Sequence, residues 1–197
     1  MKYAKGEGRM HSLSTNQDSE FMSLNLENLD GRTRKLMIRE LEADVAADNV
    51  YISARLSEIG RGEYVDLLKQ AMRSQGDLWL AAQLRSVGRM NPSIMRRSLM
   101  GSVEVTMPAT APVTLAEGEF NRFYARGLCV RALEDEKREL EVYRARPTLP
   151  AGQEMADLKV GARVNVDLLL EKLRAHQSLD EALGLPPGPN SGLSVRL

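Results

Sequence analysis

The aromatic side chains of this chain gather in one predicted helix, and that helix constrains the fold more than any other feature. Only 5% of the residues are aromatic, yet Phe120, Phe123 and Tyr124 fall within five consecutive positions. They share one flank of a helix that the sequence pattern predicts over residues 115–135. Because large aromatic side chains dominate the energetics of cores and interfaces, this helix is either the centre of the fold or a surface that a partner covers.

Arginines project from the other faces of the same predicted helix. Aromatic residues and arginine are both enriched in protein–protein interfaces, so the helix supplies a candidate contact surface. Its candidate protein-contact residues are Phe120, Arg122, Phe123, Tyr124 and Arg126. A central core helix with its arginines in water is the alternative, and the sequence favours neither interpretation. Gly127, one turn after Phe123, predicts the close approach of another backbone.

Earlier in the chain the apolar spacing predicts three more helices, over residues 31–47, 63–74 and 77–87. Asp30 is the expected N-cap of the first, and Asp77 is the expected cap of the third. The first helix has an apolar stripe, and its pattern places Glu40 on another face. The second and third helices meet at Gly76, which predicts a short helical hairpin.

Strand signals are short and few. Val103, Val105 and Met107 alternate with polar residues, and the string ELEVYR at residues 139–144 also predicts a strand. The stretch 88–101 is predicted as a loop, because it contains a proline and two glycines. A last helix follows, capped by Asn165 or Asp167.

These elements predict an α+β, mostly helical protein: a compact domain with a few short strands and extended N- and C-terminal arms. The expected divisions are a polar N-terminal arm over residues 1–28, a single mostly helical domain over residues 29–183, and a Pro/Gly-rich C-terminal arm over residues 184–197. The N-terminal arm has too little apolar area to fold alone. Within it Leu24 and Leu26 alternate with polar residues, which predicts a short extended contact.

The charge total is neutral, with 27 Lys and Arg against 27 Asp and Glu, and this argues against a protein that coats polyanions generally. One stretch of the chain is locally basic, because no carboxylate occurs between Asp77 and Glu104. The candidate phosphate-contact residues in this window are Arg85, Arg89, Arg96 and Arg97. The alternative is that these arginines pair with acidic residues elsewhere in the chain or on a neighbouring subunit.

Signals for catalysis, metals and cofactors are weak, and none of the three is expected. Glu117 and Glu119 form a Glu-x-Glu spacing that suits acid–base work, but negative charge at a helix start has a simpler explanation in the helix dipole. His11 and His176 lie too far apart to indicate a metal site or a catalytic triad. Cys129 is expected to be a buried structural thiol.

Nothing in the sequence indicates secretion or a membrane. The N-terminus lacks the apolar core of a secretory signal, and no stretch approaches the ~20 apolar residues that span a bilayer. A single cysteine excludes an intrachain disulfide. The expected location is therefore the cytoplasm or a virion.

Three strings in the second half of the chain carry a family resemblance: EGEFNRFYARGLCVRAL, EVYRARP and GLPPGPNSGLSVRL. Together they resemble an uncharacterised family found among phage and prophage structural genes, over about residues 24–197. The resemblance implies a virion or head-assembly setting, and it transfers no catalytic residue.

Two functional hypotheses follow. The first is a non-enzymatic structural or assembly protein, most plausibly a phage capsid-associated or head-assembly component, whose partners are capsid or virion proteins or further copies of itself. Its contacts would run through the arms and the aromatic–arginine helix. The second is a nucleic-acid-binding or regulatory protein that uses the four arginines of the acid-free window. A transferase or hydrolase that uses Glu117 and Glu119 is a more distant third.

Overall fold

The computed structural model describes residues 23–86, 88–98, 101–146, 154–186 and 190–197. Residues 1–22, which hold most of the predicted N-terminal arm and His11, lie outside the described residues. The helices are α1 (Gly31–Ala46), α2 (Glu58–Ser74), α3 (Asp77–Arg85), α4 (Ala111–Glu134), α5 (Glu154–Asp157), α6 (Val166–Arg174) and α7 (Leu179–Ala182). The strands are β1 (Ser93–Ser98), β2 (Gly101–Thr106), β3 (Glu139–Arg144), β4 (Arg163–Asn165) and β5 (Leu193–Arg196). The mostly helical α+β prediction is confirmed, with 52% helix and two small antiparallel sheets.

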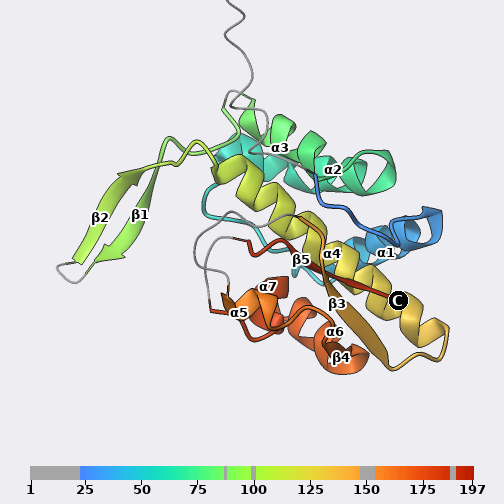
Figure 1. Ribbon diagram of the computed structural model, residues 1–197. Coiled ribbons are helices and arrows are strands. Elements are labelled where there is room, and N and C mark those ends of the chain that lie inside the picture. Colours follow the sequence, from blue (N-terminus) through green and yellow to red (C-terminus); the bar gives the residue numbers. More distant parts are fainter. Residues whose placement is uncertain (1–22, 87, 99–100, 147–153, 187–189) are drawn as a thin grey trace, which may run out of the picture.

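Helix α4 runs through the middle of the domain (Figure 1). It packs against α1 and α3 on one side and against α6 and the three-stranded sheet on the other. Because neighbours surround it, 19 of its 24 residues are buried. Close packing explains Gly127, since a Cβ there would lie 3.2 Å from both the Met37 nitrogen and the Thr33 oxygen of α1. The predicted close approach of another backbone is confirmed.

Side-chain caps set the start of several helices. Asp30 caps α1 by accepting hydrogen bonds from the backbone N–H groups of Arg32 and Thr33, as predicted. Helix α2 begins at Glu58, five residues before the predicted start, because the Ser57 hydroxyl accepts from the Gly60 N–H.

Asp77 is the first residue of α3 rather than its cap. Its buried carboxylate instead accepts hydrogen bonds from the Ser23 hydroxyl and the Leu24 N–H. Leu24 is itself buried, and the Asn25 N–H donates to the Ala145 carbonyl. Residues 23–28 of the predicted N-terminal arm therefore pack on the domain of their own chain.

The C-terminal segment joins the core. The three-stranded sheet has the order β4-β3-β5, and β5 pairs antiparallel with β3 from Glu141↔Arg196 to Arg144↔Leu193. Leu193 and Val195 are buried, and the sequence prediction of an arm is wrong for residues 193–196. The Pro/Gly-rich composition of the preceding stretch led to the arm prediction, but four residues suffice to add a strand to a preformed edge.

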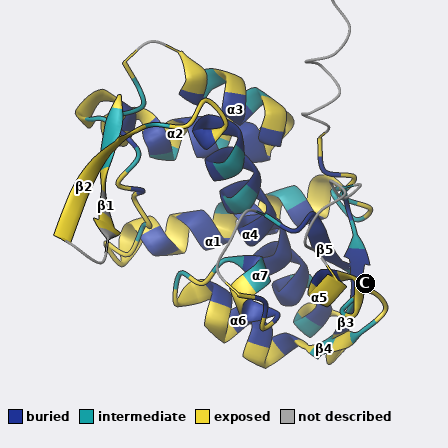
Figure 2. Cartoon of the chain, turned by 60° about the vertical axis from the view of Figure 1, so that its left-hand side comes forward, coloured by how far each residue is buried: buried dark blue, intermediate teal, exposed yellow. Residues whose placement is uncertain are grey.

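A two-stranded hairpin of β1 and β2 projects from the domain (Figures 1 and 2). The register runs from Ser93↔Thr106 to Ser98↔Gly101. The strand predicted near Val103 and Val105 is confirmed as β2. The loop prediction is wrong for residues 93–98, which form β1. In the part of the chain that the structure describes, no helix is long and apolar enough to cross a membrane.

Candidate functional site

The candidate contact residues of α4 lie inside the protein. Phe120, Phe123 and Tyr124 are fully buried, and Arg122 and Arg126 are each 1% exposed. The prediction that these five residues form a protein-contact surface is therefore wrong, because the helices and the sheet that pack on α4 cover all five. The alternative of a central core helix is correct for the aromatic residues, but the two arginines are not in water either.

Buried carboxylates on α1 neutralise Arg126. Its guanidinium donates to Glu40 at 2.9 and 3.0 Å and to Asp44 at 2.6 and 2.8 Å. Arg174 of α6 also donates to Glu40, at 2.7 and 2.9 Å. Hydrogen bonds from Arg174 and the charges of both arginines lower the pKa of Glu40 against the opposing effect of burial. The network ties α1, α4 and α6 together.

The spacing of residues on α1 could have predicted this network. Residues 36, 37, 40, 41 and 44 are all buried on α1, at the spacing of one helical face. Glu40 and Asp44 therefore occupy the apolar stripe, and the prediction that Glu40 lies on another face is wrong. Two acids within an apolar stripe indicate a buried cationic partner.

The two glutamates of the Glu-x-Glu spacing belong to different ion pairs. Glu119 accepts from Arg122 at 2.7 and 3.2 Å, and the Arg122 guanidinium also donates to the Leu173 carbonyl. Glu117 lies 3.3 Å from the Arg146 guanidinium. The helix-start interpretation is also wrong, because α4 begins at Ala111 and the dipole effect is confined to the first turn.

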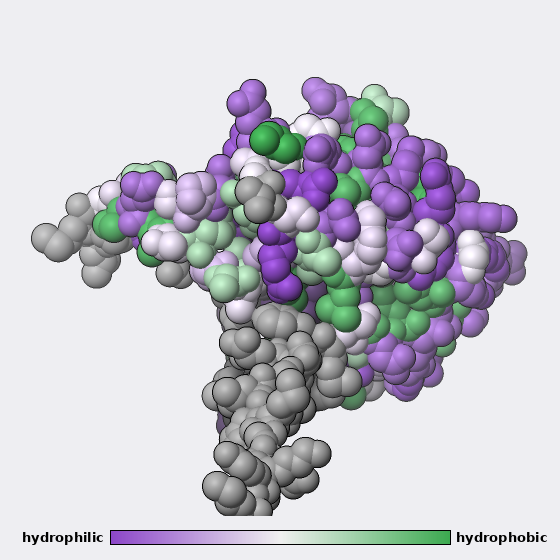
Figure 3. Space-filling model, turned by 90° about the horizontal axis from the view of Figure 1, so that it is seen from above, coloured by the Kyte–Doolittle hydropathy of each residue, from purple (hydrophilic) through white to green (hydrophobic). Residues whose placement is uncertain are grey.

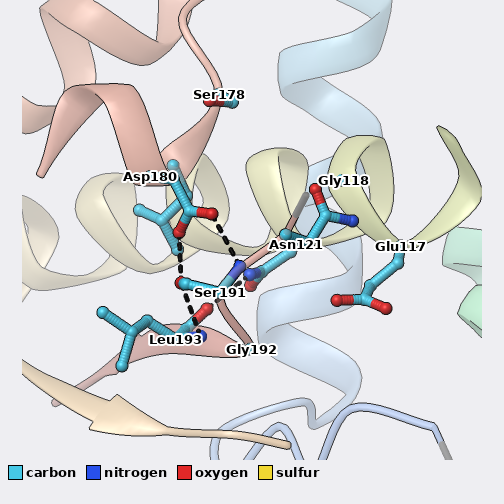
Figure 4. A pocket seen from close by; sticks show the side chains of 10 residues that line it. Glu117, Gly118, Asn121, Ser178, Asp180, Ser191, Gly192 and Leu193 are labelled. Carbon is cyan, nitrogen blue, oxygen red and sulfur yellow. Dashed lines mark hydrogen bonds between the residues drawn. The ribbon is translucent and has the colours of Figure 1, made fainter. Parts of the chain in front are cut away.

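Glu117 borders a small pocket between α4, α7 and the chain entering β5 (Figure 4). Burial raises its pKa to about 7, while the Arg146 charge opposes the shift. Asp180 accepts from the N–H and hydroxyl of Ser191, and Asn121 donates to the Leu193 carbonyl at 2.8 Å. The pocket measures about 20 Å³, which is room for about one water. These polar groups hold the C-terminal segment.

The four arginines of the acid-free window lie in three different segments of the fold. Arg89 is paired within the chain, with Glu63 and the Gln83 carbonyl, as the alternative interpretation expected. Arg85 is exposed at the end of α3, and Arg97 is exposed on β1. Arg96 also belongs to β1, with its backbone paired to Val103. The hairpin therefore carries two of the four.

The two faces of the hairpin differ in chemistry. Directly opposed residues share a face of an antiparallel ribbon and alternate residues of one strand do too, so Ile94, Val103 and Val105 lie on one face. We call Ile94, Val103 and Val105 the apolar face of the hairpin. The other face carries Ser93, Met95, Arg97, Ser102, Glu104 and Thr106. Val103 is 53% exposed, and Figure 3 shows apolar residues on the projecting hairpin.

The apolar face continues into a groove at the root of the hairpin. The Met107 N–H donates to the Pro92 carbonyl at 2.8 Å, which extends the register by one pair and puts both residues on the apolar face. Together with Met90, Pro108 and Pro112 they line a groove of about 340 Å³. Arg85 also lines it. This hairpin-root groove was not predicted, because it forms from segments that meet only in the fold.

The remaining sequence candidates have structural explanations. Cys129 is fully buried, and burial raises the pKa of its thiol to about 12, as expected of a structural cysteine. His176 pairs with Asn49. Among the residues that the structure describes, no three His, Cys, Asp or Glu side chains are grouped so as to hold a metal ion.

Comparisons with protein-family models, with curated proteins and with solved structures each return no match.

Proposed function

We propose that this chain is a non-enzymatic structural or assembly protein that contacts other proteins through its β1–β2 hairpin. The observation that carries the proposal is the hairpin itself. It projects from the domain with Val103 and Val105 exposed on its apolar face. A two-stranded hairpin is marginally stable in water unless something packs on it, and each strand here packs chiefly on the other.

The virion setting is part of the proposal. The resemblance to phage and prophage structural genes supports a capsid-associated or head-assembly component. The polar groups near Glu117 hydrogen-bond the C-terminal segment, as Asn121 does with Leu193 and Asp180 does with Ser191. These contacts support a structural role for the surroundings of Glu117.

The test is sedimentation of the purified protein, alone and with the proteins encoded beside it. We expect species larger than the 21.9 kDa protomer. Val103→Asp places a charge on the apolar face and should return the protein to the protomer mass. Ser102→Asp, one residue away on the opposite face, is the matched control and should sediment like the wild type. A protein that stays monomeric in both settings, at every concentration, refutes the proposal.

A second proposal, nucleic-acid binding, is favoured by one observation. A two-stranded β-ribbon fits the major groove of DNA, and this ribbon carries Arg96 and Arg97. If the proposal holds, replacing both arginines with alanine weakens binding to a labelled duplex and flattens its salt dependence. An unchanged affinity contradicts it.

A further inference from the structure

We propose that the protonation of Glu117 controls whether the C-terminal segment, residues 190–197, stays docked on its own domain. The proposal concerns a different part of the chain from the hairpin and does not rest on the proposed function. Three features of the structure carry it: the enclosure of Glu117 by this segment, the loosely placed arginine that faces its carboxylate, and the contacts that join that arginine to the segment.

The C-terminal segment forms one wall of the pocket beside Glu117 (Figure 4). Residues 190–193 line this pocket together with α4 and with residues 178–180 at the start of α7. Glu117 itself is only 5% exposed. Undocking of the C-terminal segment would open this wall and bring water to the Glu117 carboxylate.

Glu117 is paired less closely than other buried carboxylates of the domain. Glu40 and Glu119 each accept two or more hydrogen bonds from arginine side chains, at 2.7–3.2 Å. Glu117 instead has the Arg146 guanidinium at 3.3 Å and the side chain of Asn190. Among the residues that the structure describes, the Nε atom of Arg146 is buried and has no hydrogen-bond partner. A buried carboxylate that faces one loosely placed cation is costly to ionise, because the loss of hydration outweighs the attraction.

The charges around Glu117 act on it from three neighbouring elements. Burial is the largest cause of its raised pKa, and the Arg146 charge, on the chain that follows β3, opposes the shift. The carboxylates of Asp77 at the start of α3 and of Asp180 on α7 raise the pKa further. Both of these carboxylates are themselves held in place by hydrogen bonds. The docked state therefore favours the protonated form of Glu117, whereas water would stabilise the ionised form once the segment has left.

Arg146 joins Glu117 to the C-terminal segment. Its guanidinium donates to the Asn190 carbonyl at 3.1 Å, and its backbone N–H donates to the Gly192 carbonyl at 3.0 Å. Gly192 has a φ of +75°, and a Cβ there would lie 2.9 Å from the Arg146 carbonyl oxygen, so the segment packs directly on this backbone. The Asn190 side chain also donates to the Thr114 carbonyl of α4. The groups that hold the segment are therefore the groups that surround Glu117.

Raising the pH favours undocking. The pKa of Glu117 is about 7 in the docked state and should return toward its ordinary value of 4.5 once water reaches the carboxyl. Between these two values the undocked population should rise by up to about tenfold for each pH unit. Undocking would uncover the edge of β3 that β5 covers, and an uncovered strand edge can pair with another chain.

Hydrogen exchange of the β5 backbone amides, measured over a series of pH values and corrected for the intrinsic exchange rate, tests the proposal. Between about pH 5.5 and pH 8 the open population of residues 193–196 should rise by about 30-fold in the wild type. In Glu117→Gln it should stay nearly constant, because the amide does not titrate. Glu171→Gln is the matched control, since Glu171 is exposed on α6, and it should follow the wild type.

Amides of α4 that exchange only when the whole domain unfolds are the reference for local opening. The β5 amides should exchange faster than these at every pH, because the segment undocks while the domain stays folded. If the corrected exchange of β5 does not change with pH, or if it equals that of the α4 reference amides, the proposal is overturned. A rise that persists in Glu117→Gln overturns it as well.

Discussion

Replacing Arg126 with methionine should destabilise the domain more than any surface ion-pair substitution. The variant removes a guanidinium that is 1% exposed and keeps an unbranched side chain in its place. Glu40 retains its two hydrogen bonds from Arg174. Asp44 loses both of the hydrogen bonds that its carboxylate accepts from Arg126 and remains buried, with a side chain that is 7% exposed.

The magnitude follows from that uncompensated carboxylate. Breaking a buried ion pair by removing one partner costs about 3–5 kcal/mol, because the remaining charge stays out of water. A loss of 1 kcal/mol lowers the melting temperature of a 150–250-residue domain by about 2–4 °C. The expected fall for Arg126→Met is therefore about 6–20 °C.

Urea unfolding followed by the fluorescence of Trp79, which packs against the core, measures the free energy of unfolding. Arg39→Met is the matched control, because Arg39 pairs with Glu134 on the surface, and it should cost at most about 1 kcal/mol. Adding Asp44→Asn to Arg126→Met removes the stranded charge and should recover about 1–3 kcal/mol. If Arg126→Met costs no more than Arg39→Met, the buried network contributes nothing and this reasoning fails.

Substitutions at Glu117, Gly60 and Gly62 should change the free energy of unfolding in directions that the structure defines. Glu117→Gln removes a carboxyl whose pKa is raised from 4.5 to about 7, so the folded state of the wild type binds the proton more tightly than the unfolded chain. The free energy of unfolding of the wild type should therefore fall by about 3 kcal/mol as pH rises from 4.5 to about 7. The variant should lack this pH dependence in urea titrations at a series of pH values. If the two proteins lose stability in parallel as pH rises, the prediction is contradicted. Gly60→Ala places a Cβ 2.1 Å from the Arg89 carbonyl oxygen and should cost about 2 kcal/mol or more in the same assay. Gly62 lies on the same helix, and a Cβ there would have no neighbouring atom within 4 Å. Gly62→Ala should therefore stabilise the folded domain by up to about 1 kcal/mol. Equal effects of the two substitutions would refute the packing argument.

Elements with a regular spacing of apolar residues were predictable from the sequence, and the hairpin shows why others were not. The Asp30 cap and the close approach at Gly127 follow from the local sequence, whereas the predicted buried face of α1 was wrong for Glu40. Strand β2 is exposed along its whole length, yet the alternation of Val103 and Val105 predicted it. Strand β1 has two adjacent apolar residues followed by two arginines, so its sequence does not alternate. Its residues therefore resemble a loop until β2 is placed beside them.

The partners of the buried arginines were beyond local prediction for a different reason. Arg126 is 82 residues from Asp44 and 86 from Glu40 in sequence. The sequence around an arginine on a helix does not show whether the guanidinium pairs with a buried carboxylate or faces water. Only the placement of α1 against α4 decides between them, and that placement is a property of the whole fold.

The distribution of arginine bears on where the proposed contact site of this neutral chain can lie. On α4 and β5 the arginines pair with carboxylates of their own protomer, as Arg126, Arg131 and Arg196 do, so a partner would have to break an existing pair to reach them. The hairpin is in the opposite situation. Its strands gain little from pairing with each other in water, and each Å² of apolar surface that a partner covers there contributes about 25 cal/mol. If the proposed assembly forms, its free energy would come from an element on which the domain core does not depend.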